Sequence, residues 1–248
     1  MKIIKYKKGS KGLYKLELDN GNTLNLYEEV ILKYELLLKK EIFEEDIFKI
    51  EKLNQEWDVY YVALNSIKSR FKSVHDTKEF LRKKEYPIDL IELACDKLVK
   101  QGYLNDRSFA KGFINNQIVT TNNGPNKIKR ELLEHRVDYD IICDELDIFD
   151  EETQCEKIEK VALRLLKTNR SRGGSVLKNK IITDLINFGY GVDLINKVIT
   201  KFDFSNNEDI AMKEYNKLYK RLSRKYDGKE LEYKIKEKLY QKGLYYEN

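Results

Sequence analysis

The stretch "QGYLNDRSFA", residues 101–110, interrupts a helical pattern with a glycine, two aromatic residues and an Asn-Asp pair. Gly102 suits the left-handed residue that follows the end of a helix. We expect Tyr103 and Leu104 to pack after this end, and either Asn105 or Asp106 to cap the next helix. The stretch is therefore predicted to be a joint between two helices, formed by Gly102, Tyr103, Leu104, Asn105, Asp106, Phe109 and Ala110.

A second pattern repeats along the chain at an almost constant spacing. Four anchor residues lie 51, 53 and 54 positions apart, namely Tyr86, Val137, Tyr190 and Leu244. The first three are followed by a spacer, an apolar residue, an aspartate and two apolar residues. The aspartate can accept hydrogen bonds from the free N–H groups that open a helix. These aspartates are Asp89, Asp140 and Asp193.

Periods of this size indicate stacked supersecondary units, each too small to bury its own apolar face. The predicted fold class is mainly α, with tandem three-helix repeats stacked into an elongated, curved solenoid behind a small N-terminal β element and helices. We expect the last unit to be partial, as terminal caps often are. The expected parts are an N-terminal extension at 1–58, with its strands within 2–27, repeats at 59–104, 105–153 and 154–205, and a partial repeat at 206–248.

The N-terminal residues alternate apolar and polar side chains, which predicts strands. The "DNGN" segment at 19–22 predicts a hairpin with a type I′ turn. From residue 28 the apolar residues have helical spacing and form one stripe, made of Val30, Ile31, Tyr34, Leu37 and Leu38. A further helix is predicted around 44–71, with core side chains Trp57, Tyr60, Tyr61 and Leu64.

Charge is unevenly distributed in a chain whose net charge is +5. Residues 137–156 contain nine acids and no Lys or Arg, whereas residues 160–183 contain seven bases and no acid. The second segment could be a binding face for an anionic partner, with weak and salt-dependent phosphate contacts. The two segments could equally face each other or be solvated. The basic block consists of Lys160, Arg164, Lys167, Arg170, Arg172, Lys178 and Lys180.

The sequence contains few candidate catalytic residues. His75 and His135 have no metal-ligand partner at helical spacing, and no nucleophile or nucleotide-binding motif occurs. The "RGGS" segment at 172–175 is better interpreted as a turn than as a phosphate cradle. We expect no catalytic residue, no metal, no cofactor and no small-molecule substrate.

The cysteines and the hydropathy pattern predict the compartment. Cys95 and Cys143 lie on apolar stripes, where a free cysteine behaves as a small hydrophobe. The three cysteines are far apart in sequence, and no run of 18 apolar residues occurs. We expect a reduced, cytoplasmic protein with no membrane contact.

Three segments resemble the RecX family of bacterial recombination regulators. They are "GYLNDRSFA", "NNGPNKIKRELLEHRV" and "FGYGVDLINKVI". The N-terminal "LYKLELDNGNTLNLYEEVILKYEL" is similar to the extension of longer members from low-GC Gram-positive bacteria. This chain has Glu85, and the "EHRV" turn at 134–137, where the family usually has glycine.

The resemblance implies a function in DNA repair, homologous recombination and the SOS response. Family members bind the RecA recombinase and its filament on single-stranded DNA, and they limit filament growth or favour disassembly. They modulate the ATPase and strand exchange of RecA without being enzymes, and they meet single-stranded DNA indirectly or weakly. Two alternatives stay open: a free-standing DNA-binding protein with helix-turn-helix-like modules, and a scaffold with an unrelated partner.

Overall fold

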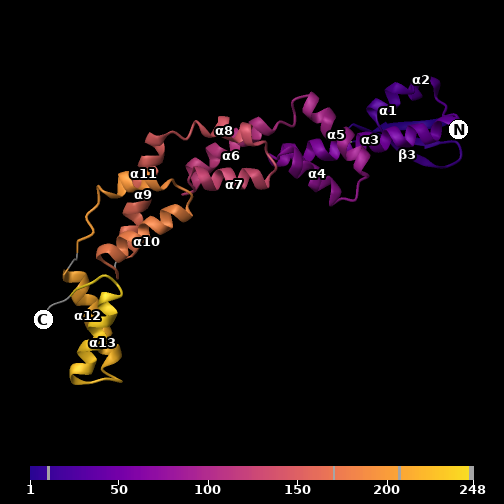
Figure 1. Ribbon diagram of the computed structural model, residues 1–248. Coiled ribbons are helices and arrows are strands. Elements are labelled where there is room, and N and C mark those ends of the chain that lie inside the picture. The colour runs from indigo at the N-terminus through magenta and orange to yellow at the C-terminus, as the bar shows by residue number, and fades with distance from the viewer. Residues whose placement is uncertain (10–11, 170, 206–207, 246–248) are drawn as a thin grey trace. The chain divides into compact units, whose positions relative to one another are not determined.

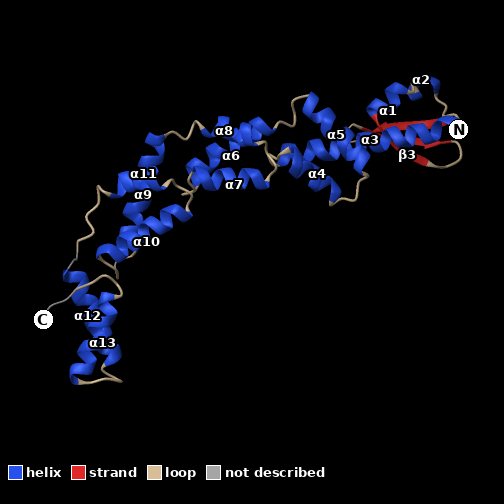
Figure 2. Cartoon of the chain, in the orientation of Figure 1, coloured by secondary structure: helices blue, strands red, loops and turns tan. Residues whose placement is uncertain are grey.

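The computed structural model describes residues 1–9, 12–169, 171–205 and 208–245. In these residues it contains thirteen helices and one three-stranded antiparallel sheet (Figures 1 and 2). The predicted class, mainly helical with a small N-terminal sheet, is confirmed. The chain divides into two compact units, Met1–Phe109 with His135–Asp138, and Ala110–Glu134 with Tyr139–Asn248.

The sheet has the order β1-β2-β3. The predicted hairpin between β2 and β3 is present, but the predicted type I′ turn is wrong. Gly21 has a φ of 82° and donates its N–H to the carbonyl of Leu18 at 3.0 Å. Leu18 in turn donates to the carbonyl of Asn22, so three residues form the loop. Asn20 accepts the N–H of Asn22 through its side chain at 3.0 Å, which stabilises this longer turn. The strands are β1 Ile3–Lys8, β2 Leu13–Leu18 and β3 Thr23–Tyr27.

The helical stripe predicted after residue 28 is broken into two short helices, α1 Glu28–Lys33 and α2 Leu36–Lys39. Glu35 lies between them with a φ of 52°, which rotates α2 relative to α1. Leu38 is consequently 82% exposed, and its predicted place in the stripe is wrong.

The helix predicted around 44–71 is continuous and forms α3, Glu44–Ser69. The expected boundary between 58 and 59 therefore lies inside a helix. Tyr60 and Leu64 are buried in the cluster that α3 forms with α4, Val74–Arg82, and α5, Ile88–Lys100, while Trp57 and Tyr61 pack partly buried against it.

Asp58 on α3 joins the sheet to the first anchor. Its carboxylate accepts the hydroxyl of Tyr27 at 2.8 Å and that of Tyr86 at 2.7 Å. Burial, followed by the bond to Asp58, raises the pKa of Tyr86 to about 12. The N-terminal sheet is thereby tied to the helices that follow.

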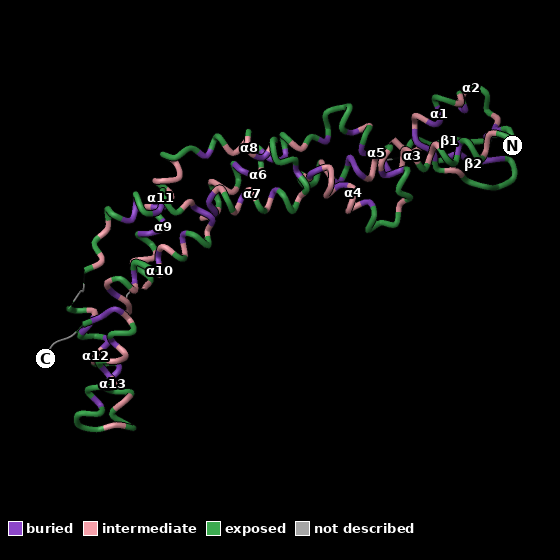
Figure 3. The backbone as a smooth tube through the Cα atoms, viewed as in Figure 1, coloured by how far each residue is buried: buried purple, intermediate pink, exposed green. Residues whose placement is uncertain are grey.

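The remaining helices are shorter and, with few exceptions, have one buried stripe each. Figure 3 shows buried, intermediate and exposed residues succeeding one another along them. The helices are α6 Asp106–Thr120, α7 Pro125–Glu134, α8 Tyr139–Leu146, α9 Glu151–Thr168, α10 Gly174–Asn187, α11 Val192–Ile199, α12 Glu208–Leu222 and α13 Gly228–Tyr240.

The four anchors lie in equivalent turns. Each follows a residue with positive φ, and these are Glu85, Arg136, Gly189 and Gly243. Where the bond is recorded, the anchor N–H donates to the carbonyl five residues earlier, at 3.4 Å for Tyr86, 3.2 Å for Tyr190 and 3.0 Å for Leu244. Val137, Tyr190 and Leu244 are buried, and Tyr86 is half-buried. All four anchors therefore follow a left-handed residue at a helix end, and Tyr86, Tyr190 and Leu244 close that end with the same backbone bond.

The predicted capping role of the aspartates after the anchors is wrong for two of them. The N-caps of α5 and α11 are Pro87 and Gly191, and neither end has a side-chain cap bond. Asp89 and Asp193 occupy the second helical position, two residues after the N-cap. Each instead places a negative charge in the first turn, which interacts favourably with the helix dipole.

Candidate functional site

The joint at 101–110 ends α5 as predicted. Gly102 has a φ of 76° and donates to the carbonyl of Val99, and Tyr103 donates to the carbonyl of Leu98, both at 3.0 Å. This pair of bonds is a Schellman motif. Leu104 is buried, as are Phe109 and Ala110 on α6. The predicted packing of Tyr103 is wrong: its side chain is 55% exposed, because Leu104 takes the core position beyond the turn.

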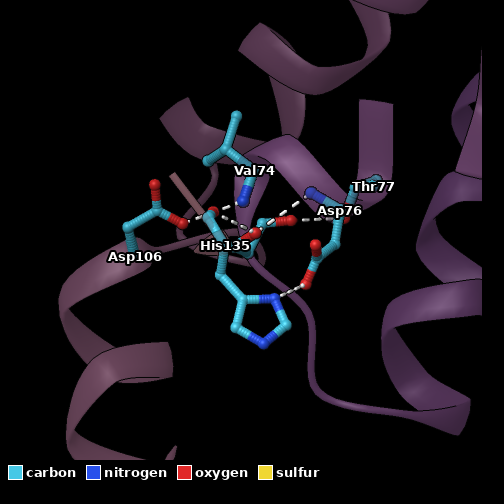
Figure 4. Close-up of polar contacts among 6 residues, drawn as sticks. Val74, Asp76, Thr77, Asp106 and His135 are labelled. Atoms are coloured by element: carbon cyan, nitrogen blue, oxygen red, sulfur yellow. Dashed lines mark hydrogen bonds and ion pairs between the residues drawn. The ribbon is translucent and has the colours of Figure 1, made fainter. Parts of the chain in front are cut away.

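The Asn-Asp pair contacts two different helices. Asn105 caps α6, because its Oδ1 accepts the N–H of Ser108 at 2.9 Å. Asp106 instead accepts the N–H of Val74, the first residue of α4, at 2.8 Å (Figure 4). Burial raises the pKa of Asp106, and the bond from Val74 opposes this shift. The joint therefore binds the start of one helix to the start of another.

Ser73, the residue before α4, is buried and makes two bonds. Its hydroxyl donates to the carbonyl of His135 at 3.0 Å and accepts the N–H of Asp76 at 3.0 Å. The ring of His135 lies with Nδ1 2.8 Å from Oδ2 of Asp76 (Figure 4). This histidine is thus part of a structural contact between the start of α4 and the turn before Val137.

The residues before α7 and α10 make the corresponding contact through the backbone. Gly124 donates its N–H to the carbonyl of Phe188 at 2.7 Å, and Gly173 donates to the carbonyl of Lys242 at 2.9 Å. Each accepting carbonyl lies two residues before an anchor, as that of His135 does. The "RGGS" segment is therefore a packed turn, in agreement with its sequence interpretation, because the Gly173 N–H is already bonded.

The basic block is divided between two helices. On α9 its three members, Lys160, Arg164 and Lys167, have i, i+4, i+7 spacing and lie opposite the buried Ile158, Val161 and Ala162. On α10, Lys178 and Lys180 lie about 200° apart around the helix and do not share a face. Arg172 lies in the connecting turn, half-buried, and Arg170 is outside the described residues.

Acidic neighbours reduce the charge of this block. Lys160 lies 3.8 Å from Glu156, and Lys180 pairs with Asp184 one turn further on. Both lysines are substantially exposed, so each pair contributes little to stability. The structure therefore brings together the three α9 residues as a stripe and does not gather all seven.

A second basic stripe, which the sequence reasoning missed, lies on α12. Its members are all exposed, while Ala211 and Leu218 on the other side of α12 are buried. The i, i+4, i+7, i+8 spacing is visible in the sequence, but the stripe is shorter than the run without acids at 160–183. The stripe consists of Lys213, Lys217, Lys220 and Arg221, and Arg224 continues it in the turn just beyond the helix.

In the part of the chain that the structure describes, no group of three His, Cys, Asp or Glu residues could hold a metal ion. Burial raises the pKa of the Cys95 thiol to about 11, so this cysteine is a poor nucleophile. A search of the same residues finds no helix whose length and apolar character would let it cross a bilayer.

No family model matches the chain. Full-length relatives do. The regulatory protein RecX of Listeria monocytogenes serotype 4a is 30% identical over 253 residues, covering 100% of this chain and 94% of that protein. The regulatory protein RecX of Streptococcus sanguinis is 31% identical over 248 residues, covering 98% and 95%. The chain belongs to the RecX family. The resemblance inferred from the joint and the anchors is thereby confirmed.

Two solved structures show the RecX fold in this chain. A crystal structure of regulatory protein RecX matches with a TM-score of 0.69 and 24% identity, covering 79% of this chain and 98% of the other. The crystal structure of RecX from Lactobacillus salivarius matches with a TM-score of 0.57, also at 24% identity, covering 60% and 97%. The chain is thus a regulatory protein of this family with the family's helical architecture.

Proposed function

We propose that this RecX-family chain binds the RecA recombinase and its filament on single-stranded DNA, and inhibits its ATPase, filament growth and strand exchange. The observation that carries the proposal is the full-length similarity, at about 30% identity, to proteins named regulatory protein RecX. The chain acts as a regulator rather than as an enzyme, and it shares the cytoplasm with RecA.

The recurring turns support a binding mode built from several small contacts. We propose that the units are the repeats 59–104, 105–153 and 154–205 with the partial repeat 206–248, each containing one anchor. A filament presents the same RecA surface at every protomer, so similar units on one chain can engage similar sites. Linked contacts of modest strength then add up to high avidity, provided that they can be made simultaneously.

The α9 stripe is the part of the predicted basic block that can act as one surface. We propose that Lys160, Arg164 and Lys167 speed the approach to a filament that carries DNA, since complementary charge raises association rates more than it raises affinity. Arg172, Lys178 and Lys180 lie beside this stripe in sequence, and we assign them a smaller share.

The direct test is the ATPase of the cognate RecA on single-stranded DNA, titrated with the purified chain. The proposal expects hydrolysis to fall as the chain approaches the RecA concentration. An unchanged rate at a molar excess of the chain would contradict the proposal. Tight binding to duplex DNA without RecA, with no effect on the ATPase, would instead favour a free-standing DNA-binding protein.

Charge reversal tests the α9 stripe. The triple variant Lys160→Glu, Arg164→Glu, Lys167→Glu should inhibit more slowly, with an association rate on the order of 10-fold lower at low salt. A matched control reverses three exposed lysines of the sheet, Lys5, Lys7 and Lys15, and so makes the same change in net charge. Equal inhibition by both variants and the wild-type protein would remove the stripe from the mechanism.

A further inference from the structure

The basic stripe of α12 is denser than that of α9. Four cations, Lys213, Lys217, Lys220 and Arg221, follow one face of α12 within nine residues, and Arg224 lies in the turn just beyond the last helical residue. At 1.5 Å per residue the four helical cations span about 12 Å. Glu208 and Asp209 lie in the first turn of the helix, and Glu214 is the only acid between residues 210 and 226. The segment from Lys217 to Arg224 therefore carries several positive charges and no acid of its own.

The packing of α12 holds this face toward solvent. Ala211 and Leu218 are buried against α13, in a cluster that includes Leu231, Ile235 and Leu239. Because these residues occupy one side of α12, the cations that lie on the other side are exposed. The orientation of the stripe is thus determined by the core.

Glu214, the acid nearest the middle of the stripe, is already engaged on the buried side. Glu214 is 8% exposed and accepts Lys242 at 2.6 Å. Lys217 lies 3.7 Å from its other carboxylate oxygen, at the edge of the stripe. The carboxylate therefore stabilises the contact with the α13 end of the chain and neutralises at most one cation of the row.

An exposed aromatic ring lies on the adjoining flank of α12. Tyr219 is 48% exposed and stacks on Tyr215, with ring centroids 6.3 Å apart and an interplanar angle of 23°. At 3.6 residues per turn, Tyr219 lies about 100° around the helix from Lys220, the nearest cation of the stripe. Cations and an exposed ring on one helix are the composition of a surface that binds single-stranded nucleic acid, where phosphates meet Lys and Arg and a base stacks on the aromatic face.

We propose that the α12 stripe binds the phosphate backbone of single-stranded nucleic acid, with Tyr219 stacking on a base. A strand carries one phosphate per about 3.4 Å of B-form axis, so a row of about 12 Å matches several phosphates. A protein partner fits less well, because the cores of protein interfaces are depleted of lysine, and three of the four helical cations are lysines. The inference rests on the proposed function, since it assigns α12 to the DNA of the filament.

The test measures binding of the full chain to a fluorescent thymidine oligonucleotide, without RecA, over a range of salt concentrations. The variant Lys213→Gln, Arg221→Gln, Arg224→Gln should bind on the order of 100-fold more weakly near 0.1 M salt. Its plot of log affinity against log salt should be less steep by about 2, since each single-strand phosphate contact contributes about 0.7. The control variant Lys5→Gln, Lys7→Gln, Lys15→Gln changes net charge equally and should stay within about 2-fold of wild type.

Tyr219→Ala separates stacking from charge. It should weaken binding by about 10-fold while leaving the salt dependence unchanged. Unaltered helical circular dichroism of the variants shows that α12 is still folded.

Three results would overturn the inference: no binding of the oligonucleotide by the wild-type chain, equal binding by the Lys213 triple variant, or loss of DNA-free RecA binding in that variant with DNA binding intact. The last outcome would assign the stripe to a protein. A wild-type chain that binds the oligonucleotide through α12 but leaves the RecA ATPase unchanged would refute the proposed function alone.

Discussion

Ser73, Gly124 and Gly173 each lie just before a helix and contact the turn that precedes an anchor, and we call each of these contacts a joint. The three joints occupy corresponding positions but are made differently. At Ser73 a hydroxyl reaches the carbonyl of His135, with Asp76 beside it. At Gly124 and Gly173 the backbone N–H itself meets the facing carbonyl. In the first joint a side chain separates the two backbones; in the other two the backbones are in contact.

This difference explains why glycine precedes two anchors, Tyr190 and Leu244, whereas an arginine can precede Val137. A Cβ on Gly189 would lie 2.5 Å from the backbone nitrogen of Lys127, and one on Gly243 would lie 2.2 Å from the carbonyl oxygen of Gly173. Only glycine fits where the backbones touch. At the Ser73 joint the hydroxyl keeps the two backbones apart, so there is room for the side chain of Arg136. The φ of this residue is 56°, a conformation that glycine would adopt more easily.

The largest expected effect is that of a methyl group at the close joints. Gly243→Ala and Gly189→Ala combine left-handed strain with overlap against backbone atoms, and should each lower the free energy of unfolding by about 3 kcal/mol or more. Chemical denaturation measures this. Gly102→Ala is the matched control, since Gly102 has a φ of 76° and a Cβ there would have nothing within 4 Å.

The control should lose only about 1–2 kcal/mol, the cost of the left-handed conformation alone. If all three variants are equally destabilised, backbone contact is not what requires glycine at the close joints.

Removing the spacer hydroxyl should have a smaller effect. Ser73→Ala deletes the N-cap bond of α4 and leaves the carbonyl of His135 without its donor, so we expect a loss of about 2 kcal/mol in unfolding free energy. Ser223→Ala, at an exposed position, should change stability by less than about 0.5 kcal/mol. Equal stability of both variants would show that the Ser73 joint does not depend on its side chain.

Two substitutions to glycine should stabilise the protein instead of destabilising it. Arg136→Gly and Glu85→Gly relieve left-handed strain, and part of this gain is lost to the greater entropy of the unfolded chain. Each should raise the free energy of unfolding by about 0.5–1 kcal/mol, seen as a higher thermal midpoint. A loss of stability at position 136 would mean that the arginine side chain itself supports the joint.

The smallest effect concerns pH. Burial raises the pKa of Asp106 above 3.8, so the folded state binds this proton more tightly than the unfolded state does. Stability contributed by the protonated carboxyl is therefore lost as pH rises from the unfolded pKa through the folded one. Asp106→Asn keeps an oxygen for the N–H of Val74 and removes this dependence. The difference in unfolding free energy between variant and wild type should shift in favour of the variant as pH rises, and a constant difference would contradict the assignment.

Much of the fold follows from local rules. The alternating N-terminal residues predicted the strands, and the anchor spacing predicted four equivalent helix ends. Gly102 has the predicted left-handed conformation. These features depend on a few neighbouring residues, and sequence patterns record such neighbours directly.

The predictions from sequence fail where contacts between residues far apart in the chain determine the structure. Nothing local shows that Leu38 points to solvent after the turn at Glu35, or that Asp106 bonds to Val74, thirty-two positions earlier. The basic block contains no acid, but its partners Glu156 and Asp184 lie four residues outside its two ends, one helical turn away. The α12 stripe was missed although its spacing is visible in the sequence.

Native-state amide hydrogen exchange at the joints tests the central claim most directly. The account predicts that the amides of Gly124 and Gly173 exchange at least 100-fold more slowly than that of Asp227. Asp227 precedes α13 and, among the described residues, has no facing turn. Exchange of all three amides at the same rate, as expected for open loops, would contradict the claim that the helices of this chain are joined by direct backbone contact.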